Sequence, residues 1–304
     1  ARFRRGGSSV RLSVHLPPLH GPALREYVRS LEGLGVDFVL ATDHVVMPQP
    51  RPDGTPRSIY PPTLRMLEPL ATLAFVAGCT ERIGLETGVL ILPQRQPALV
   101  AKTVATLDFL SGGRVRLGVG VGWQEPEFEA MGVPFRERGA RMDEAIEVLK
   151  LLWTSDHATF RGRFYTLDDM VAEPKPAQRP HPPLLCGGAA PAALRRAGRL
   201  ANGWIANAQQ TPESFRANRE RVLAAAREAG REAEVTIFEA AAAPPSENPA
   251  DLAPRIRAFR EAGATDFALW PAMGMRAAPS LRTPEGQIAY LRRFVEEVWP
   301  EFRG

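Results

Sequence analysis

Residues 82–123, RIGLETGVLILPQRQPALVAKTVATLDFLSGGRVRLGVGVGW, carry the pattern that decides the fold. Residues 83–92 are apolar with few charges, which is typical of a buried strand. Pro97 can begin a helix, where its missing N–H is not needed, and Gly112 and Gly113 can end it. A second apolar strand follows at residues 114–121. The stretch therefore predicts a strand–helix–strand unit whose two strands are parallel neighbours.

The same alternation extends along the rest of the chain. Further strands are predicted at residues 11–16, 37–41, 183–186, 203–207, 235–240 and 266–270, and further helices at 22–34, 68–78, 138–153, 191–200, 212–229, 249–262 and 284–297. Eight strands alternating with eight helices favour an α/β fold of the (β/α)8 type, a TIM barrel, over an open doubly wound sheet. We assign residues 11–304 to one barrel domain and residues 1–10 to a disordered N-terminal tail.

The segments between these elements differ in character. Residues 45–63 are rich in proline and arginine, and their length is typical of a functional loop or a lid. Residues 124–137 are predicted to be a second loop, and residues 173–183 contain five prolines, which exclude regular structure. Residues 159–167 predict a small hairpin that turns at Arg161-Gly162.

Composition excludes several classes of protein. The net charge is +4, but the arginines are scattered among acidic residues, so no basic stripe for nucleic acid is expected. No apolar run reaches the roughly 18 residues that span a bilayer, and residues 1–9 lack the apolar segment of a secretory signal. Cys79 and Cys186 are too few for a disulfide framework, which suits a cytoplasmic protein.

Polar residues and glycines gather where the predicted strands end, which is where TIM barrels build their sites. His44 can exchange a proton near neutral pH, and the adjacent Asp43 can bind a ligand donor, although a pair that only closes a loop is the alternative. The remaining histidines are spread out, which disfavours a metal site. Gly187 and Gly188 stand before a helix, so they predict either a phosphate site or a plain turn.

The GVGVG run at residues 118–122 lacks the spacing of a dinucleotide fingerprint and is not a Walker loop. It fits a ligand that approaches the backbone closely, or a tightly packed core strand. Trp123 either stacks on a ring or fills a gap. The acids of residues 125–129, Glu127 among them, are candidate site residues or part of a solvated loop. Glu86 interrupts the most apolar strand and needs a partner or a raised pKa, so it is a candidate catalytic acid, with Thr87 or an arginine of the long loop as its partner.

The ordered motifs ATDH (41–44), ETGVLILP (86–93), GGRVRLGVGVGW (112–123), VPFRERGARMDEAIEVLKLLW (133–153), F-x-G-x-F-Y (160–165) and PPLLCGG (182–188) resemble the luciferase-like flavin monooxygenase superfamily. Within it, the chain is most similar to actinobacterial oxidoreductases that use the deazaflavin coenzyme F420. The resemblance covers about residues 11–275. It implies a TIM barrel whose strand ends hold F420 or FMN, and, because relatives are often dimers, a homodimer is expected.

The resemblance also implies roles for particular residues. His44 matches a catalytic acid/base, and Asp43 matches an aspartate that touches the deazaflavin. A non-proline cis peptide would fall at Gly88-Val89 and form a bulge that backs the ring, and Gly187 and Gly188 match residues that hold the cofactor phosphate. Two departures matter. Family members often carry a small residue in place of Glu86, and the sugar-phosphate dehydrogenases carry a glutamate in place of Trp123, so glucose-6-phosphate is a poor candidate substrate.

The sequence therefore predicts an F420-dependent oxidoreductase that passes a hydride between C5 of the deazaflavin and a small organic substrate. An FMN-dependent monooxygenase that uses O2 with a partner reductase, and a barrel that binds F420 or flavin without turnover, are the alternatives. Arg51, Arg57 and Arg65 are candidates to meet an acidic cofactor tail. The candidate catalytic residues are His44 and Glu86, and the candidate cofactor-binding residues are Asp43, Thr87, Gly88, Val89, Gly120, Gly122, Trp123, Glu127, Gly187 and Gly188.

Overall fold

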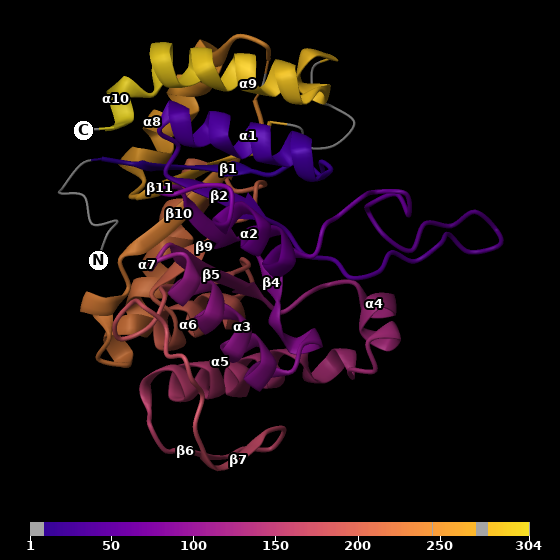
Figure 1. Ribbon diagram of the computed structural model, residues 1–304, viewed down its shortest axis with the longest axis vertical. Helices are drawn as coiled ribbons and strands as arrows, with labels where there is room; N and C mark the ends of the chain where they lie inside the picture. Colours follow the sequence, from indigo (N-terminus) through magenta and orange to yellow (C-terminus); the bar gives the residue numbers. More distant parts are fainter. Residues whose placement is uncertain (1–8, 245, 272–278, 304) are drawn as a thin grey trace.

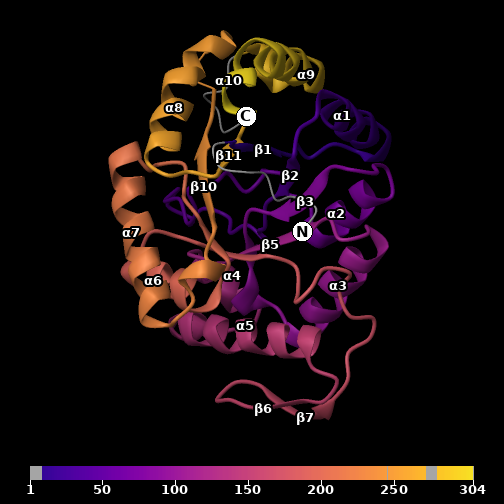
Figure 2. The ribbon, with the colours of Figure 1, turned by 90° about the vertical axis from the view of Figure 1, so that its left-hand side faces the viewer.

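The computed structural model describes residues 9–244, 246–271 and 279–303, which form a closed barrel of parallel strands surrounded by helices (Figure 1, Figure 2). The strands follow the order β3-β2-β1-β11-β10-β9-β8-β5, and β3 also pairs with β5, which closes the barrel. The TIM barrel prediction is therefore confirmed. The strands are β1 (Arg11–His15), β2 (Phe38–Ala41), β3 (Gly84–Thr87), β4 (Leu90–Ile91), β5 (Val115–Gly120), β8 (Leu184–Gly187), β9 (Gly203–Ile205), β10 (Ile237–Ala242) and β11 (Asp266–Leu269).

The helices lie where the periodicity predicts them, and most begin with a proline in the first turn. On α5, Met142, Ile146, Leu149 and Trp153 recur at helical spacing, and all four are buried. The helices around the barrel are α1 (Gly21–Leu34), α2 (Pro69–Ala77), α3 (Pro97–Leu110), α5 (Arg138–Thr154), α6 (Pro191–Leu200), α7 (Pro212–Glu228), α8 (Ala253–Glu261) and α9 (Pro284–Arg293), and the C-terminal turn is α10 (Pro300–Arg303).

The predicted strand at residues 83–92 is interrupted. β3 ends at Thr87, the Gly88-Val89 peptide is cis, and the chain resumes as the short β4, followed by the 3-10 turn η1 (Leu92–Gln94). Periodicity could not show this break, because both parts are apolar and both pair with β5. The cis peptide expected from the family resemblance is present at the predicted position.

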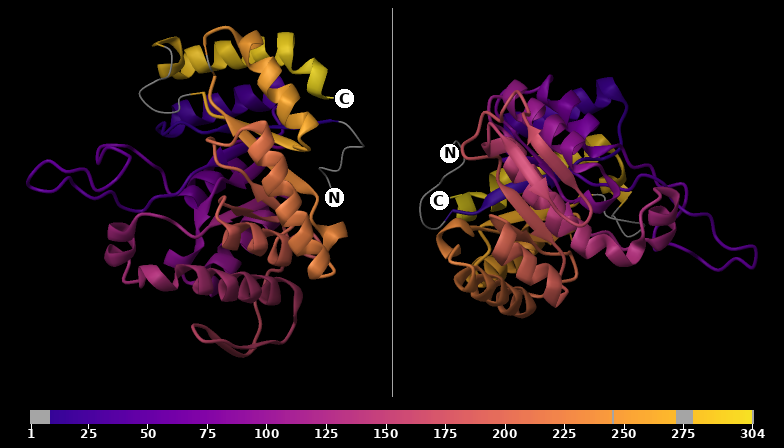
Figure 3. Two further views of the ribbon diagram at one scale, coloured as in Figure 1. Left: turned by 180° about the vertical axis from the view of Figure 1, so that it is seen from behind. Right: turned by 90° about the horizontal axis from the view of Figure 1, so that it is seen from below.

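Three segments outside the barrel differ in how well they were predicted. Residues 42–68 contain neither helix nor strand, and this loop projects far from the barrel, as expected (Figure 1, Figure 3). The predicted loop at 124–137 is wrong in part, because it contains the helix α4 (Glu125–Ala130) and the 3-10 turn η2 (Phe135–Glu137). The predicted hairpin is confirmed as β6 (Ala158–Arg161) paired antiparallel with β7 (Thr166–Met170).

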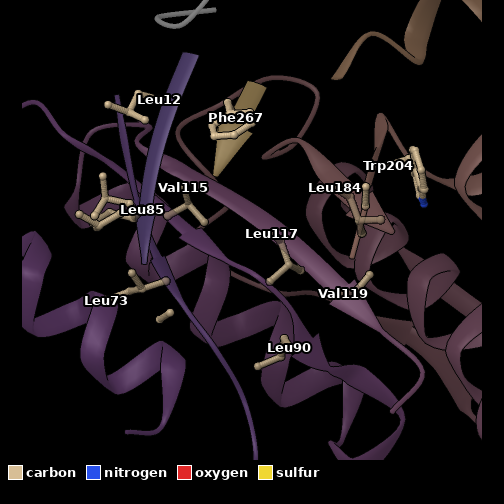
Figure 4. Packing of buried hydrophobic residues seen from close by; sticks show 14 of the residues in the cluster. Leu12, Leu73, Leu85, Leu90, Val115, Leu117, Val119, Leu184, Trp204 and Phe267 are labelled. Carbon is tan, nitrogen blue, oxygen red and sulfur yellow. The ribbon is translucent and has the colours of Figure 1, made fainter. Parts of the chain in front are cut away.

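The main hydrophobic core lies between the strands and the surrounding helices. Side chains such as Leu85, Val115 and Leu117 point from the strands toward this layer, with Leu73 of α2 facing them (Figure 4). Val10 belongs to the same core, and its N–H donates to the Phe302 carbonyl at 2.8 Å. Residues 1–8 of the predicted tail lie outside the described residues. In the described part of the chain, no helix is long and apolar enough to cross a membrane.

Candidate active site

The ends of β2, β3 and β5 meet at one side of the barrel mouth. Ala41 of β2 is in register with Thr87 of β3, and Ile91 of β4 is in register with Gly120 of β5. Because parallel strands of a barrel end at the same rim, the residues that follow them are brought together. His44, the cis Gly88-Val89 bulge and Trp123 therefore share one region, as the sequence predicts.

His44 is held by Glu127 of α4. Its Nδ1 lies 2.8 Å from Glu127 Oε2, and the Val45 N–H donates to Glu127 Oε1 at 2.5 Å. The side chains of His44 and Glu127 are 7% and 0% exposed. Glu127 was predicted among the cofactor-binding residues, and its contact in the structure is with the histidine. The two are 83 positions apart, and periodicity carries no signal for such a pair.

The Glu127 carboxylate is held in its charged form. Burial acts to raise its pKa, but the hydrogen bond and charge of His44 and the N–H of Val45 outweigh burial, so the pKa of Glu127 is lowered. Glu127 also lies in the first turn of α4, where the helix dipole favours an anion. His44 therefore faces an ionised carboxylate.

Two aromatic rings stand edge-on to the His44 imidazole. The ring centroid of Trp123 lies 5.5 Å away and that of Tyr60 5.6 Å away, and the two rings are 6.0 Å from each other. Trp123 is 44% exposed, so one side of this aromatic group is open to solvent. Sequence reasoning singled out Trp123 but missed Tyr60, whose only signal was its place in the long loop.

The Asp43 carboxylate accepts hydrogen bonds from other residues of the chain. Arg95 donates to its carboxylate through Nη2 at 2.8 Å and through Nε at 3.3 Å, and the Ile91 N–H donates at 2.9 Å. Arg95 also bonds Glu68, which caps α2. Asp43 therefore fastens the end of β2 to the strand that follows the cis bulge. Arg95 was not singled out from the sequence.

Glycines make room for the cis bulge. A Cβ at Gly120 would lie 2.6 Å from Val89 Cγ2, and one at Gly187 would lie 2.9 Å from Val89 Cγ1. Thr87 Oγ1 donates to the Gly118 carbonyl at 2.7 Å, which ties β3 to β5. A Cβ at Gly88 would collide with Leu40. The sequence left two interpretations of the GVGVG run, a ligand close to the backbone or a tightly packed core strand. The contacts of Gly118 and Gly120 with Thr87 and Val89 are those of a tightly packed core strand.

The start of α6 offers backbone groups to an anion. Gly188 adopts φ +112°, which favours glycine, and its carbonyl accepts the Trp204 indole N–H at 2.7 Å. The N-cap residue, Ala190, makes no side-chain cap, Pro191 has no N–H, and the Ala193 N–H donates to the Ala190 carbonyl at 2.8 Å, which leaves the Ala192 N–H for an anion. Gly122 is also left-handed, at φ +74°, and its carbonyl accepts from Arg138 Nε at 3.3 Å.

The predicted partner of Glu86 is wrong. Its carboxylate lies in the barrel centre, 3.4 Å from Arg116 Nη2 of β5, and is fully buried. Thr87 bonds the Gly118 carbonyl instead, and the arginines of the long loop are exposed. Because the barrel seals Glu86 from solvent, we do not retain it as a catalytic acid. The long-loop arginines Arg51, Arg57 and Arg65 point to solvent.

A second group lies at the ends of β1 and β11. The His15 imidazole stacks on the Trp270 ring at 4.4 Å between centroids, and His15 Nε2 lies 3.2 Å from Thr42 Oγ1. Burial lowers the pKa of His15 to about 4, so this ring is neutral at physiological pH. Sequence reasoning did not select either residue. In the part of the chain that the structure describes, no group of three or more histidine, cysteine or acidic side chains could hold a metal ion.

The family model for luciferase-like monooxygenases matches residues 9–290. An uncharacterized protein of Mycobacterium tuberculosis is 45% identical over 139 residues, which are 46% of this chain and 47% of that protein. The F420-dependent glucose-6-phosphate dehydrogenase of Amycolatopsis mediterranei is 33% identical over 218 residues, or 70% of this chain and 61% of that enzyme. The FMNH2-dependent dimethylsulfone monooxygenase of Pseudomonas putida is 40% identical over 131 residues, which are 42% of this chain and 36% of that enzyme. This chain spans about half of the length of the mycobacterial relatives that it matches.

Solved structures share the fold at low identity. A monooxygenase from Streptomyces bottropensis superimposes with a TM-score of 0.78 at 21% identity, covering 96% of this chain and 100% of its own. An F420-dependent secondary alcohol dehydrogenase bound to an F420-acetone adduct superimposes with a TM-score of 0.76 at 20% identity, covering 97% and 100%. These matches establish the architecture of the barrel.

Proposed function

Because the chain belongs to the luciferase-like monooxygenase family, we propose that it is an F420-dependent oxidoreductase in which His44 moves the proton that accompanies hydride transfer. The substrate is a small organic molecule at the barrel mouth. The observation that carries the proposal is the position of His44, at the end of β2, beside the cis Gly88-Val89 bulge and edge-on to the partly exposed Trp123.

The residues present fit a flat ring with an anionic tail. The bulge is set into the barrel rim by Gly120 and Gly187, whose missing side chains admit Val89. The start of α6 suits a phosphate through the helix dipole and the Ala192 N–H. When bound there, the deazaflavin would supply C5 as the hydride carrier.

Within this arrangement the chain's own residues position and move a proton. Asp43 and Arg95 hold the segment that carries His44 against β4. Trp123 and Tyr60 restrict the imidazole from two sides. A substrate hydroxyl or carbonyl oxygen that reaches His44 can therefore lose or gain a proton there.

An FMN-dependent monooxygenase that uses O2 and a partner reductase is the second candidate, supported by the similarity to the Pseudomonas putida enzyme. The F420 proposal is preferred because the similarity to the Amycolatopsis mediterranei dehydrogenase covers 70% of this chain, against 42% for the monooxygenase. A barrel that carries F420 or flavin without turnover is the third alternative.

Titration with F420 and with FMN tests the proposal, with tryptophan fluorescence as the readout, because Trp123 is partly exposed beside His44. We expect micromolar or tighter binding of F420 and much weaker binding of FMN. Preference for FMN would favour the monooxygenase, and binding of neither would overturn both. A His44→Ala variant that binds F420 but no longer reduces or oxidises any substrate turned over by the wild type would exclude the carrier.

A further inference from the structure

We infer that Glu127 is the positioning residue of the site: it keeps a hydrogen on Nδ1 of His44 and leaves Nε2 as the atom that exchanges the proton. This inference rests on the proposed function of His44 and extends it to a residue of a different element, α4. It concerns which ring nitrogen reacts, which the proposed function leaves open.

The tautomer follows from the state of the carboxylate. An ionised carboxylate can only accept hydrogen bonds, and the contact to Glu127 Oε2 involves Nδ1 at 2.8 Å. The hydrogen must therefore sit on Nδ1. The other oxygen, Oε1, accepts the Val45 N–H, so both oxygens are engaged and the carboxylate cannot turn away.

This arrangement assigns the direction of the reacting lone pair. In the oxidative direction, the O–H bond of the substrate breaks and its proton bonds to Nε2, while the hydrogen of the C–H bond leaves with both bonding electrons and a C=O bond forms; a bound deazaflavin would be the hydride acceptor. The resulting imidazolium is stabilised by the buried Glu127 carboxylate. In the reductive direction, Nε2 returns the same proton to the oxygen.

Nitrogen NMR of the cofactor-free protein, with labelled histidine, tests the assignment without any turnover. We expect the Nδ1–H tautomer for neutral His44 in the wild type and in Glu129→Gln, a matched control on the exposed side of α4. Glu127→Gln should lose this preference and Glu127→Asp should keep part of it. An Nε2–H tautomer in the wild type would overturn the inference, even if Glu127→Gln does not fold.

Kinetics then separate positioning from mere stability. Glu127→Gln should lower kcat at least about 10-fold with little change in KM, because a histidine that is no longer positioned loses part of the roughly 10²- to 10⁴-fold contribution of general acid–base catalysis. An unchanged kcat would contradict the inference. If the protein turns over no substrate with F420, the proposed function fails, whereas the NMR result on Glu127 still stands.

A second and independent observation lies in the barrel centre, where three carboxylates and two guanidinium groups are enclosed. Asp266 of β11 accepts from Arg11 Nη2 at 2.7 Å and from Arg116 Nη1 at 2.8 Å. Glu86 lies 3.4 Å from Arg116 Nη2, and Glu239 of β10 accepts from Ser13 Oγ at 3.2 Å. We propose that Glu86 and Glu239 share a single proton, which makes this cluster a pH-sensitive element of the barrel.

Charge balance supports the shared proton. Three ionised carboxylates opposite two guanidinium groups would leave one uncompensated negative charge in a sealed interior, which is strongly unfavourable. The seal is tight, because Glu86, Glu239 and Asp266 are fully buried and the Arg116 guanidinium stacks 3.7 Å from the Phe38 ring centroid. One proton on the glutamate pair makes the cluster neutral. Asp37, which also acts on Arg116, is half-buried and accepts the Leu12 N–H.

The hydrogen bonds lead to the same conclusion. Within the described residues, no donor satisfies either oxygen of Glu86 or Oε1 of Glu239. The Glu86 and Glu239 carboxyl groups lie within hydrogen-bonding reach of each other, so a proton on one turns it into a donor toward the other. Burial raises the pKa of Glu86 to about 7, against the opposing charge of Arg116, and burial and the Glu86 charge raise the pKa of Glu239.

The sign of the pH effect follows from the raised pKa values. The folded protein keeps a proton that an unfolded glutamate releases above about pH 4.3. The stabilisation is complete below that pH and is lost as the pH rises through the folded pKa, about 7 for Glu86. One retained proton lowers the folding equilibrium constant about tenfold per pH unit across this window.

Denaturant unfolding between pH 5 and 9 tests the proposal, with Glu86→Gln and Glu239→Gln compared with wild type and with the exposed Glu261→Gln as control. We expect wild-type stability to fall between pH 5 and about 7, and both glutamine variants in the cluster to lose this fall and to exceed wild type at pH 8. The same slope in wild type and both variants would overturn the proposal. If the variants do not fold, carboxyl carbon NMR of the wild type decides: two carboxyl groups already ionised at pH 5.5 would overturn it.

Discussion

Glu127 at the barrel mouth and Glu86 in the barrel centre are both buried, yet their surroundings act on them in opposite directions. Burial acts to raise both pKa values. At the mouth, His44 and the Val45 N–H outweigh it and lower the pKa of Glu127. In the centre, Arg116 is shared with Asp266 and cannot outweigh it, so the pKa of Glu86 rises to about 7. The number of donors that face a buried carboxylate decides its charge, and burial alone does not.

The two regions also differ in access. At the mouth, the His44 side chain is 7% exposed and lies beside Trp123, which is 44% exposed. In the centre, Phe38 covers Arg116 and the surrounding strands exclude solvent. We therefore expect substitutions at the mouth to affect activity and substitutions in the centre to affect stability.

The largest expected effect is on activity at the mouth. His44→Ala should lower kcat about 10²- to 10⁴-fold, the range for loss of a general acid or base, while the affinity for F420 stays close to wild type. Steady-state kinetics and fluorescence titration measure the two quantities. Residual activity near the wild-type value would show that another group moves the proton.

The largest expected effect on stability is in the centre. Asp266→Asn removes the carboxylate that bonds both Arg11 and Arg116, and should cost about 3–5 kcal/mol of unfolding free energy, as loss of a buried ionic partner does. Glu297→Gln, which removes only an exposed partner of Arg293, should change it by less than about 0.5 kcal/mol. Equal effects in the two variants would break the contrast between a sealed and a solvated ion pair.

The boundary between the two regions can be tested at Gly120. Gly120→Ala would bring a Cβ 2.6 Å from Val89 Cγ2, and should cost about 1–3 kcal/mol of stability through overpacking and weaken F420 binding. Gly33→Ala on α1 is the matched control, since nothing lies within 4 Å of its Cβ, and it should stabilise by about 0.5–1 kcal/mol. Unchanged stability and binding in Gly120→Ala would show that the bulge accommodates a methyl group.

The smallest expected effect sharpens the comparison of the two glutamates. Glu127→Gln should lower stability at pH 7 by about 1–2 kcal/mol, because a hydrogen bond to a charged group is lost. Since the pKa of Glu127 is lowered in the folded state, this stabilisation is present above the unfolded pKa and is lost as the pH falls through the folded pKa. Unfolding curves at several pH values should therefore show a slope opposite to that of the Glu86–Glu239 pair. If stability changed with pH in the same direction for Glu127 and for the Glu86–Glu239 pair, the opposite charge states assigned to the two sites would be contradicted.

Elements with a strong local pattern could be predicted from the sequence. The apolar stripe of α5, the proline-started helices and the apolar runs of the barrel strands are signals within a few residues of each other. The family resemblance added the cis Gly88-Val89 peptide, which the apolar run at 83–92 does not reveal. The short α4 was missed because six residues with three acids carry no clear amphipathic pattern.

The sequence by itself determined the order of the eight barrel strands, and therefore that His44 and Trp123 meet at one rim. Only the tertiary structure decided the partners of the charged groups. Glu127 reaches His44 across 83 residues, and Arg116 reaches Asp266 across 150. The physical reason is that periodicity reports which face of an element is buried, whereas the charge state of a buried group depends on donors that the closed barrel brings from other strands.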